Sequence, residues 1–213
     1  MADRVVQGWR LFWALAFIVS AAILAAVPGT DFGSAHGMEH IILHSVHCAL
    51  PFFVLAFVAS SLATLFPGRL SRWLLANRRY LGLTFAVGMG WHIGFVAYSF
   101  GAFGRQLNFT AIALDATALA FLIAMTLTSF RVFGRYLSAT AWRRLHKCGA
   151  YVIWLVATEI FFDDVRTGGD RFHIAGLCVL LAAWALRVIA WLRRKTIRSA
   201  GSRLTIQARR SSL

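Results

Sequence analysis

Six long apolar segments constrain this chain most, because a helix of about 20 mostly apolar residues crosses a hydrocarbon core about 30 Å thick. The segments cover residues 9–27, 40–66, 80–100, 110–130, 141–162 and 172–192. Pro and Gly follow the first two segments, at 28–29 and 67–68, where helices are expected to stop. The sequence therefore predicts an all-α bundle of six transmembrane helices over 1–195, followed by a flexible basic tail over 196–213.

Composition supports the bilayer as the solvent of this chain. Hydrophobic residues make up 59% of the sequence and charged residues 14%, whereas globular domains average about 45–50% and about 25%. The net charge of +14 comes from short basic clusters between apolar segments, which indicates membrane topology and not nucleic-acid binding. The three cysteines, Cys48, Cys148 and Cys178, lie in apolar segments without a CxxC spacing, so neither disulfides nor structural zinc are expected.

The distribution of basic residues predicts the orientation of the bundle. Lys and Arg concentrate after the second segment, around the turn from the fourth to the fifth, and in the tail: Arg69, Arg72, Arg78, Arg79, Arg131, Arg135, Arg143, Arg144, Lys147, and seven residues from Arg193 to Arg210. The alternate loops carry few basic residues or mix them with aspartates. Because basic loops stay in the cytoplasm, both termini are expected there, in a bacterial inner membrane.

Ionisable side chains inside the apolar segments are the candidates for chemistry, since they are costly in a membrane and usually face the bundle interior. They are His40, His44, His47, His92, Asp115, His146, Glu159 and His173. A single histidine often only joins two helices by a hydrogen bond. Several in one small bundle favour haem, which needs one or two axial imidazoles, over zinc or iron–sulfur centres, which need carboxylates or thiolates that are scarce here.

Depth along the helices separates these histidines into two levels. His92 lies 13 residues after Arg79, so it is expected about 18–20 Å from the cytoplasmic edge. His47 is expected at a similar level, about 10 Å from the outer face. His146 directly follows the Arg143–Arg144 pair and is expected within about 5 Å of the cytoplasmic edge.

His36, His40, His44 and His47 are spaced by four, four and three residues, which places them on one face of a helix. Such a stripe could bind a divalent metal, pass protons inward or contribute a haem ligand, and it could equally be a polar cap at the interface. His47 and then His44 are the favoured ligands, because they lie deepest.

Two segments resemble the ferric-reductase-like transmembrane family, and within it the haem-bearing membrane subunits of bacterial methionine sulfoxide reductase systems. They are NRRYLGLTFAVGMGWHIGFVAYS, residues 77–99, and WRRLHKCGAYVIWLVATEIFF, residues 142–162. The family pattern is an RR-x-LGL start with a histidine 13 residues later, and a W-x-x-LH start. The matching residues are Arg78, Arg79, Leu81, Gly82, Leu83 and His92, and then Trp142, Leu145 and His146.

The resemblance implies electron transfer across the membrane through one or two b-type haems, with His92 and His146 at ligand positions. Relatives carry a further histidine about 13 residues after the position of His146, and here that position is Glu159. The expected donor is quinol or a cytoplasmic flavin reductase, and the expected acceptor is a periplasmic redox protein. The chain has no GxGxxG motif and no soluble segment for a nucleotide-binding domain, so electrons must come from such a partner.

Three arrangements follow from the presence of Glu159 where relatives carry a histidine. His92 pairs with His47 or His44 around one outer haem, with Glu159 and His173 as supporting or proton-handling groups. His92 and His146 instead flank a single haem between their helices, or haem has been lost. The alternatives from other classes are a metal- or proton-handling transporter or sensor, which would use the His36–His47 stripe and Glu159, and a structural subunit whose histidines only join helices.

Overall fold

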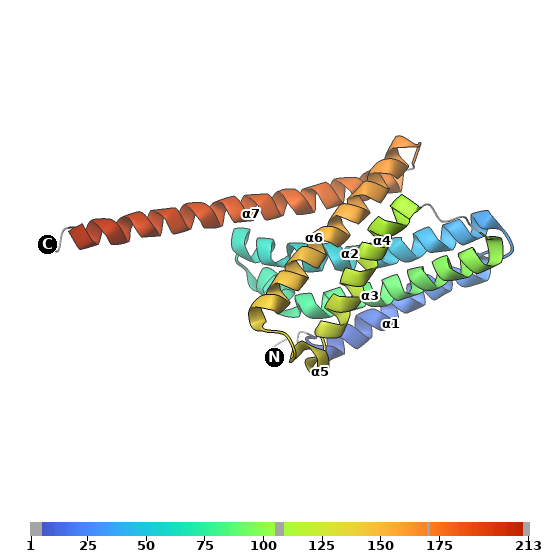
Figure 1. Ribbon diagram of the computed structural model, residues 1–213, viewed down its shortest axis with the longest axis horizontal. Helices are drawn as coiled ribbons and strands as arrows, with labels where there is room; N and C mark the ends of the chain where they lie inside the picture. The colour runs from blue at the N-terminus through green and yellow to red at the C-terminus, as the bar shows by residue number, and fades with distance from the viewer. Residues whose placement is uncertain (1–5, 105–108, 170, 211–213) are drawn as a thin grey trace.

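The structure, a computed structural model, is helical and describes residues 6–104, 109–169 and 171–210 (Figure 1). The elements in chain order are α1 (Trp9–Ala25), the 3-10 turn η1 (Val27–Gly29), α2 (Ala35–Leu65), α3 (Arg69–Phe103), α4 (Phe109–Thr128), the short α5 (Arg131–Gly134), α6 (Ala139–Arg166) and α7 (Arg171–Arg210). No strand occurs in any of these ranges, which confirms the predicted all-α class.

Small polar residues and glycines mark where these helices begin and end. The hydroxyl of Ser34 accepts the backbone N–H of Gly37 at the start of α2, and Ser138 does the same at the start of α6. At the start of α3 the Ser71 hydroxyl accepts the N–H of Gly68. These side chains satisfy backbone groups that have no partner within the first turn of a helix.

Figure 1 shows α1, α2, α3 and α7 along the long axis of the molecule, with α4 and α6 crossing them obliquely. α3 packs mainly against α2 and α1, while α4 packs against α6, and α7 packs against both α2 and α6. The largest core cluster joins α2, α3, α6 and α7 through side chains that include Phe53, Phe57, Phe85, Ile153 and Leu180.

Four of the described helices are long and apolar enough to cross a membrane: α1 extended through η1, α2, α3, and α7 over Arg171–Ile197. The apolar part of α4 that was searched, Ala113–Thr128, is shorter, and α6 is not among the four. The predicted segments 110–130 and 141–162 are therefore confirmed as helices but not as spans.

The helix boundaries differ most from the predicted ones at three places. α2 begins five residues before the predicted segment 40–66, and α3 begins at Arg69, so the basic stretch before residue 80 is helical and not a loop. α7 continues without a break across the predicted boundary at 195 and reaches Arg210. Residues 211–213 of the predicted tail lie outside the described residues, and the flexibility of the tail stays a prediction.

Candidate functional site

His92 on α3 has one imidazole nitrogen fixed by the neighbouring helix. Its Nδ1 lies 3.3 Å from the carbonyl oxygen of Ile42 and 3.3 Å from the hydroxyl oxygen of Ser45, both on α2. A carbonyl oxygen only accepts, so Nδ1 must carry the proton and donate it. The Ser45 hydroxyl donates its own proton to the same Ile42 carbonyl at 2.6 Å. In the neutral ring the lone pair therefore lies on Nε2.

This arrangement is the one that a metal-ligating histidine needs. Such histidines usually donate the second ring N–H to a carbonyl or carboxylate, which holds the ring and directs the other nitrogen to the metal. Nε2 of His92 makes no hydrogen bond to any side chain or backbone group in the described ranges. Asp115, another of the predicted residues, is exposed on α4. With the proton on Nδ1 and the lone pair on Nε2, His92 has the tautomer that an axial haem ligand needs.

The close contact between α2 and α3 that positions His92 depends on a glycine one turn earlier. A Cβ on Gly88 would lie 2.7 Å from the Cβ of Ala49 and 3.5 Å from a methyl of Val19. Since residues four apart share a helix face, Gly88 and His92 both face α2. The glycine lets the backbones approach, and the imidazole then reaches the Ile42 carbonyl.

His44 joins α2 to α1 and does not turn toward His92. Its Nε2 lies 3.1 Å from the carbonyl oxygen of Ala22, which again requires the proton on that nitrogen. The Cys48 sulfur lies 3.6 Å from the same Nε2. The nitrogen that an axial ligand would normally use is thus committed to a helix–helix hydrogen bond.

His47 faces α7, where it meets another of the predicted residues. Its ring centroid lies 3.7 Å from that of Phe172 and 6.0 Å from that of His173. Nε2 of His173 lies 3.5 Å from a carboxylate oxygen of Asp164 on α6. The structure thus brings together His47, His173 and Asp164 from three helices. Asp164 is not among the residues that the sequence marks as candidates.

His146 lies at the opposite end of the bundle, beside the last turn of α4. Its Nε2 lies 3.2 Å from the Thr128 hydroxyl, whose own proton goes to the Ala124 carbonyl at 2.6 Å. Nε2 of His146 must therefore donate, and this leaves the lone pair on Nδ1. The ring also stacks on Trp142, with centroids 4.0 Å apart. His146 lacks the tautomer that His92 has.

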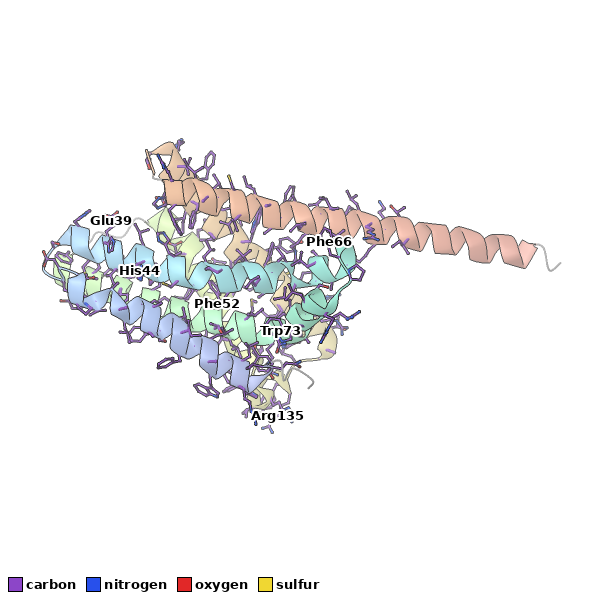
Figure 2. The ribbon with its side chains drawn as sticks, turned by 180° about the vertical axis from the view of Figure 1, so that it is seen from behind. Glu39, His44, Phe52, Phe66, Trp73 and Arg135 are labelled. Atoms are coloured by element: carbon purple, nitrogen blue, oxygen red, sulfur yellow. The ribbon has the colours of Figure 1, made fainter. Side chains whose placement is uncertain are left out.

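The remaining predicted residues are not gathered at a common centre. His36 and His40 are exposed near the start of α2, and Glu159 is exposed on α6. Within the ranges that the structure describes, the Glu159 side chain takes part in no hydrogen bond or ion pair. The same ranges contain no cluster of three or more histidine, cysteine, aspartate or glutamate side chains able to hold a metal ion. Figure 2 shows Glu39 and His44 toward one end of the bundle and Phe66, Trp73 and Arg135 toward the other.

Two arginines with interior contacts were missed as candidates. Arg187 on α7 donates to the Phe57 carbonyl at 2.6 Å and to the Tyr151 hydroxyl at 3.1 Å, and its guanidinium lies over both rings. Arg79 on α3 donates to the Ser129 carbonyl and lies 5.7 Å from the Trp9 ring centroid. A single arginine within the apolar segment 172–192 was the visible signal for Arg187. The sequence places residues 69–79 between two apolar segments, where a loop is expected, so it gives no signal for the interior contact of Arg79.

A pocket of about 580 Å³ opens at the end of the bundle where Arg79 lies. Its lining combines three arginines, Arg79, Arg131 and Arg135, with apolar and backbone groups of the α4–α5 turn and with Trp142. Of the residues that the structure describes, no aspartate or glutamate lines this pocket. It therefore has the chemistry of a site for an anion.

Comparisons of the chain with family models, with curated proteins and with solved structures found no match. The class that can be stated from the fold is therefore an all-helical protein with four helices long and apolar enough to cross a membrane.

Proposed function

We propose that this chain is a multi-pass membrane protein of six spans that binds b-type haem through His92 and transfers electrons across a bacterial inner membrane. The observation that carries the proposal is the hydrogen bond from His92 Nδ1 to the Ile42 carbonyl, because it leaves Nε2 with its lone pair. The likeness of residues 77–99 and 142–162 to ferric-reductase-like proteins supports the same ligand. α4 and α6 complete the six spans as an antiparallel pair.

Haem would supply one-electron redox chemistry, and the protein would set its ligation and burial. His92 would hold the iron from α3. Ile42 and Ser45 would keep the imidazole in one orientation through their shared contact with Nδ1. The Gly88–Ala49 contact would hold the two helices at the separation that this hydrogen bond requires.

In this proposal electrons enter from quinol or a cytoplasmic flavin reductase and leave to a periplasmic acceptor. The two ends of the bundle differ in charge: Arg79, Arg131 and Arg135 line a pocket at one end, and Asp163, Asp164 and Arg166 lie at the far end of α6. Since basic loops remain in the cytoplasm, the arginine-lined end is the inner one.

A second candidate, a proton-handling transporter or sensor, rests on the grouping of His47, His173 and Asp164. An imidazole beside a carboxylate can accept and release protons near neutral pH. The metal-handling form of this alternative has less support, because His44 and His47 face α1 and α7 respectively. Proton uptake into proteoliposomes that contain the wild type, together with its loss in His173→Ala, would favour this candidate.

The proposal is tested by the absorption spectrum of protein purified after expression with ample haem. The wild type is expected to show a Soret band, and His92→Ala is expected to lose it. His36→Ala is the matched control, since His36 is an exposed histidine at the start of α2. A wild type without a Soret band, or an unchanged band in His92→Ala, would refute the proposal.

A further inference from the structure

The arginine-lined pocket is unrelated to the proposed haem ligand. Thirteen residues of α3 separate Arg79 from His92, which corresponds to about 20 Å along the helix. The pocket lies between Arg79 in the first half of α3, the end of α4 and the start of α6. α5 forms one wall of the pocket. Whatever it binds is therefore distinct from a ligand of His92.

Among the described residues, no carboxylate pairs with the arginines of this pocket. The ion pairs among the described residues are Arg166–Asp163 and His173–Asp164, both at the far end of α6. Trp142 and Asp163 are separated by 21 residues, or about 30 Å of helix. Arg79 donates to the Ser129 carbonyl, but its buried Nε has no hydrogen-bond acceptor in the described ranges. Three arginines thus line one concave site that has no carboxylate among the described residues, although the Arg135 guanidinium also donates to the Tyr136 hydroxyl. This excess of positive charge favours a bound anion.

The surroundings of the pocket indicate which anion it would take. α5 and the residues after it expose large apolar side chains beside the arginines: Val132 is 60% exposed, Phe133 47% and Tyr136 74%. A free phosphate ion would gain nothing from these side chains. An amphiphile with a phosphate head and acyl chains would contact both the arginines and the apolar surface. Basic pockets between helices at the cytoplasmic side suit such headgroups.

We infer that the pocket lined by Arg79, Arg131 and Arg135 binds the headgroup of one anionic phospholipid, with its acyl chains against the exposed apolar side chains of α5. The phosphate accepts hydrogen bonds from the guanidinium groups, and Trp142 closes the side toward α6. The lipid phosphate offsets one of the three positive charges, and the lipid joins α3, the α4–α5 turn and the start of α6.

The experiment counts lipids retained by the full-length protein in detergent by native mass spectrometry. Phosphatidylglycerol is added in increasing amounts, with phosphatidylcholine and inorganic phosphate as separate arms. The expected result is one saturable phosphatidylglycerol, weak retention of phosphatidylcholine, and no displacement by millimolar phosphate. In the double variant Arg131→Gln/Arg135→Gln the affinity should fall about 25-fold, since each basic residue near an anionic headgroup contributes about fivefold.

The matched control is Arg143→Gln/Arg144→Gln, which removes the same charge from exposed residues at the same end that do not line the pocket. The control should keep the saturable lipid. Equal losses of phosphatidylglycerol affinity in both double variants would show that diffuse surface charge holds the lipid. This result would overturn the inference. Equal retention of phosphatidylcholine, or displacement of the lipid by inorganic phosphate, would overturn it as well.

Discussion

At the scale of single residues, the hydrogen-bond partner of each imidazole decides which nitrogen can act. His92 donates from Nδ1 to the Ile42 carbonyl, whereas His44 donates from Nε2 to the Ala22 carbonyl. His146 donates from Nε2 to the Thr128 hydroxyl. Similar residues in similar helices thus differ in chemistry, because the acceptors of the neighbouring helix lie at different points around each ring.

His44→Ala is expected to lower stability without changing any haem spectrum. The substitution leaves the Ala22 carbonyl without its side-chain donor, which costs about 1 kcal/mol. Thermal unfolding in detergent measures the change, and His40→Ala, an exposed position on the same helix, serves as the control. Loss of the Soret band in His44→Ala would show instead that His44 is an iron ligand.

At the scale of helices, glycines determine how closely the long elements approach. Gly88 lies where α3 contacts α2, Gly149 where α6 meets Met125 of α4, and Gly176 where α7 meets Phe161 of α6. In each case a side chain would collide with the facing helix. Small residues at such contacts are typical of helix packing in membranes, where apolar burial alone does not hold helices together.

Gly88→Val should destabilise the α2–α3 contact by about 1–3 kcal/mol, since the added side chain overpacks against Ala49. Gly90→Val is the matched control, because it makes the same change on the same helix where no atom lies within 4 Å of the new Cβ. Both variants make the same change in helix propensity, so the difference between their free energies of unfolding reports packing alone. Equal unfolding temperatures for the two variants would contradict the close contact.

At the scale of the whole molecule, the direction of α4 and α6 relative to the bilayer decides the number of spans. Figure 1 shows both crossing the direction of the other long helices. Arg143, Arg144 and Lys147 extend the polar start of α6 well into the helix, and Glu159 and Asp163 shorten its apolar stretch from the other end. The proposed six spans require α6 to cross despite these residues.

Single cysteines in a cysteine-free background test the six-span topology with a membrane-impermeant maleimide. Ala35→Cys and Gly168→Cys should be labelled from the periplasm, while Arg72→Cys and Ala139→Cys should react only after the membrane is opened. All four positions are exposed. If residues 139 and 168 label from the same side, α6 does not span the membrane.

Much of the fold could be predicted from the sequence. The lengths of the apolar segments locate the long helices of the described residues, and Pro and Gly mark the ends of the first two segments. The spacing of His36 to His47 also predicted a shared helix, but not that His44 would face α1 and His47 α7. Which neighbour a side chain meets depends on packing between distant segments, and helical spacing carries no such information. Asp164 beside His173 and the Ile42 carbonyl beside His92 were hidden for the same reason.

The most direct test of haem ligation by His92 is the reduced-minus-oxidised difference spectrum of membranes that carry His92→Ala or His146→Ala. Both histidines match the proposed family ligand positions, but their hydrogen-bond partners place the proton on Nδ1 of His92 and on Nε2 of His146. The haem signal should disappear in His92→Ala and persist in His146→Ala at equal protein levels. A signal that persists without His92 and disappears without His146 would contradict the assignment of His92 as the ligand.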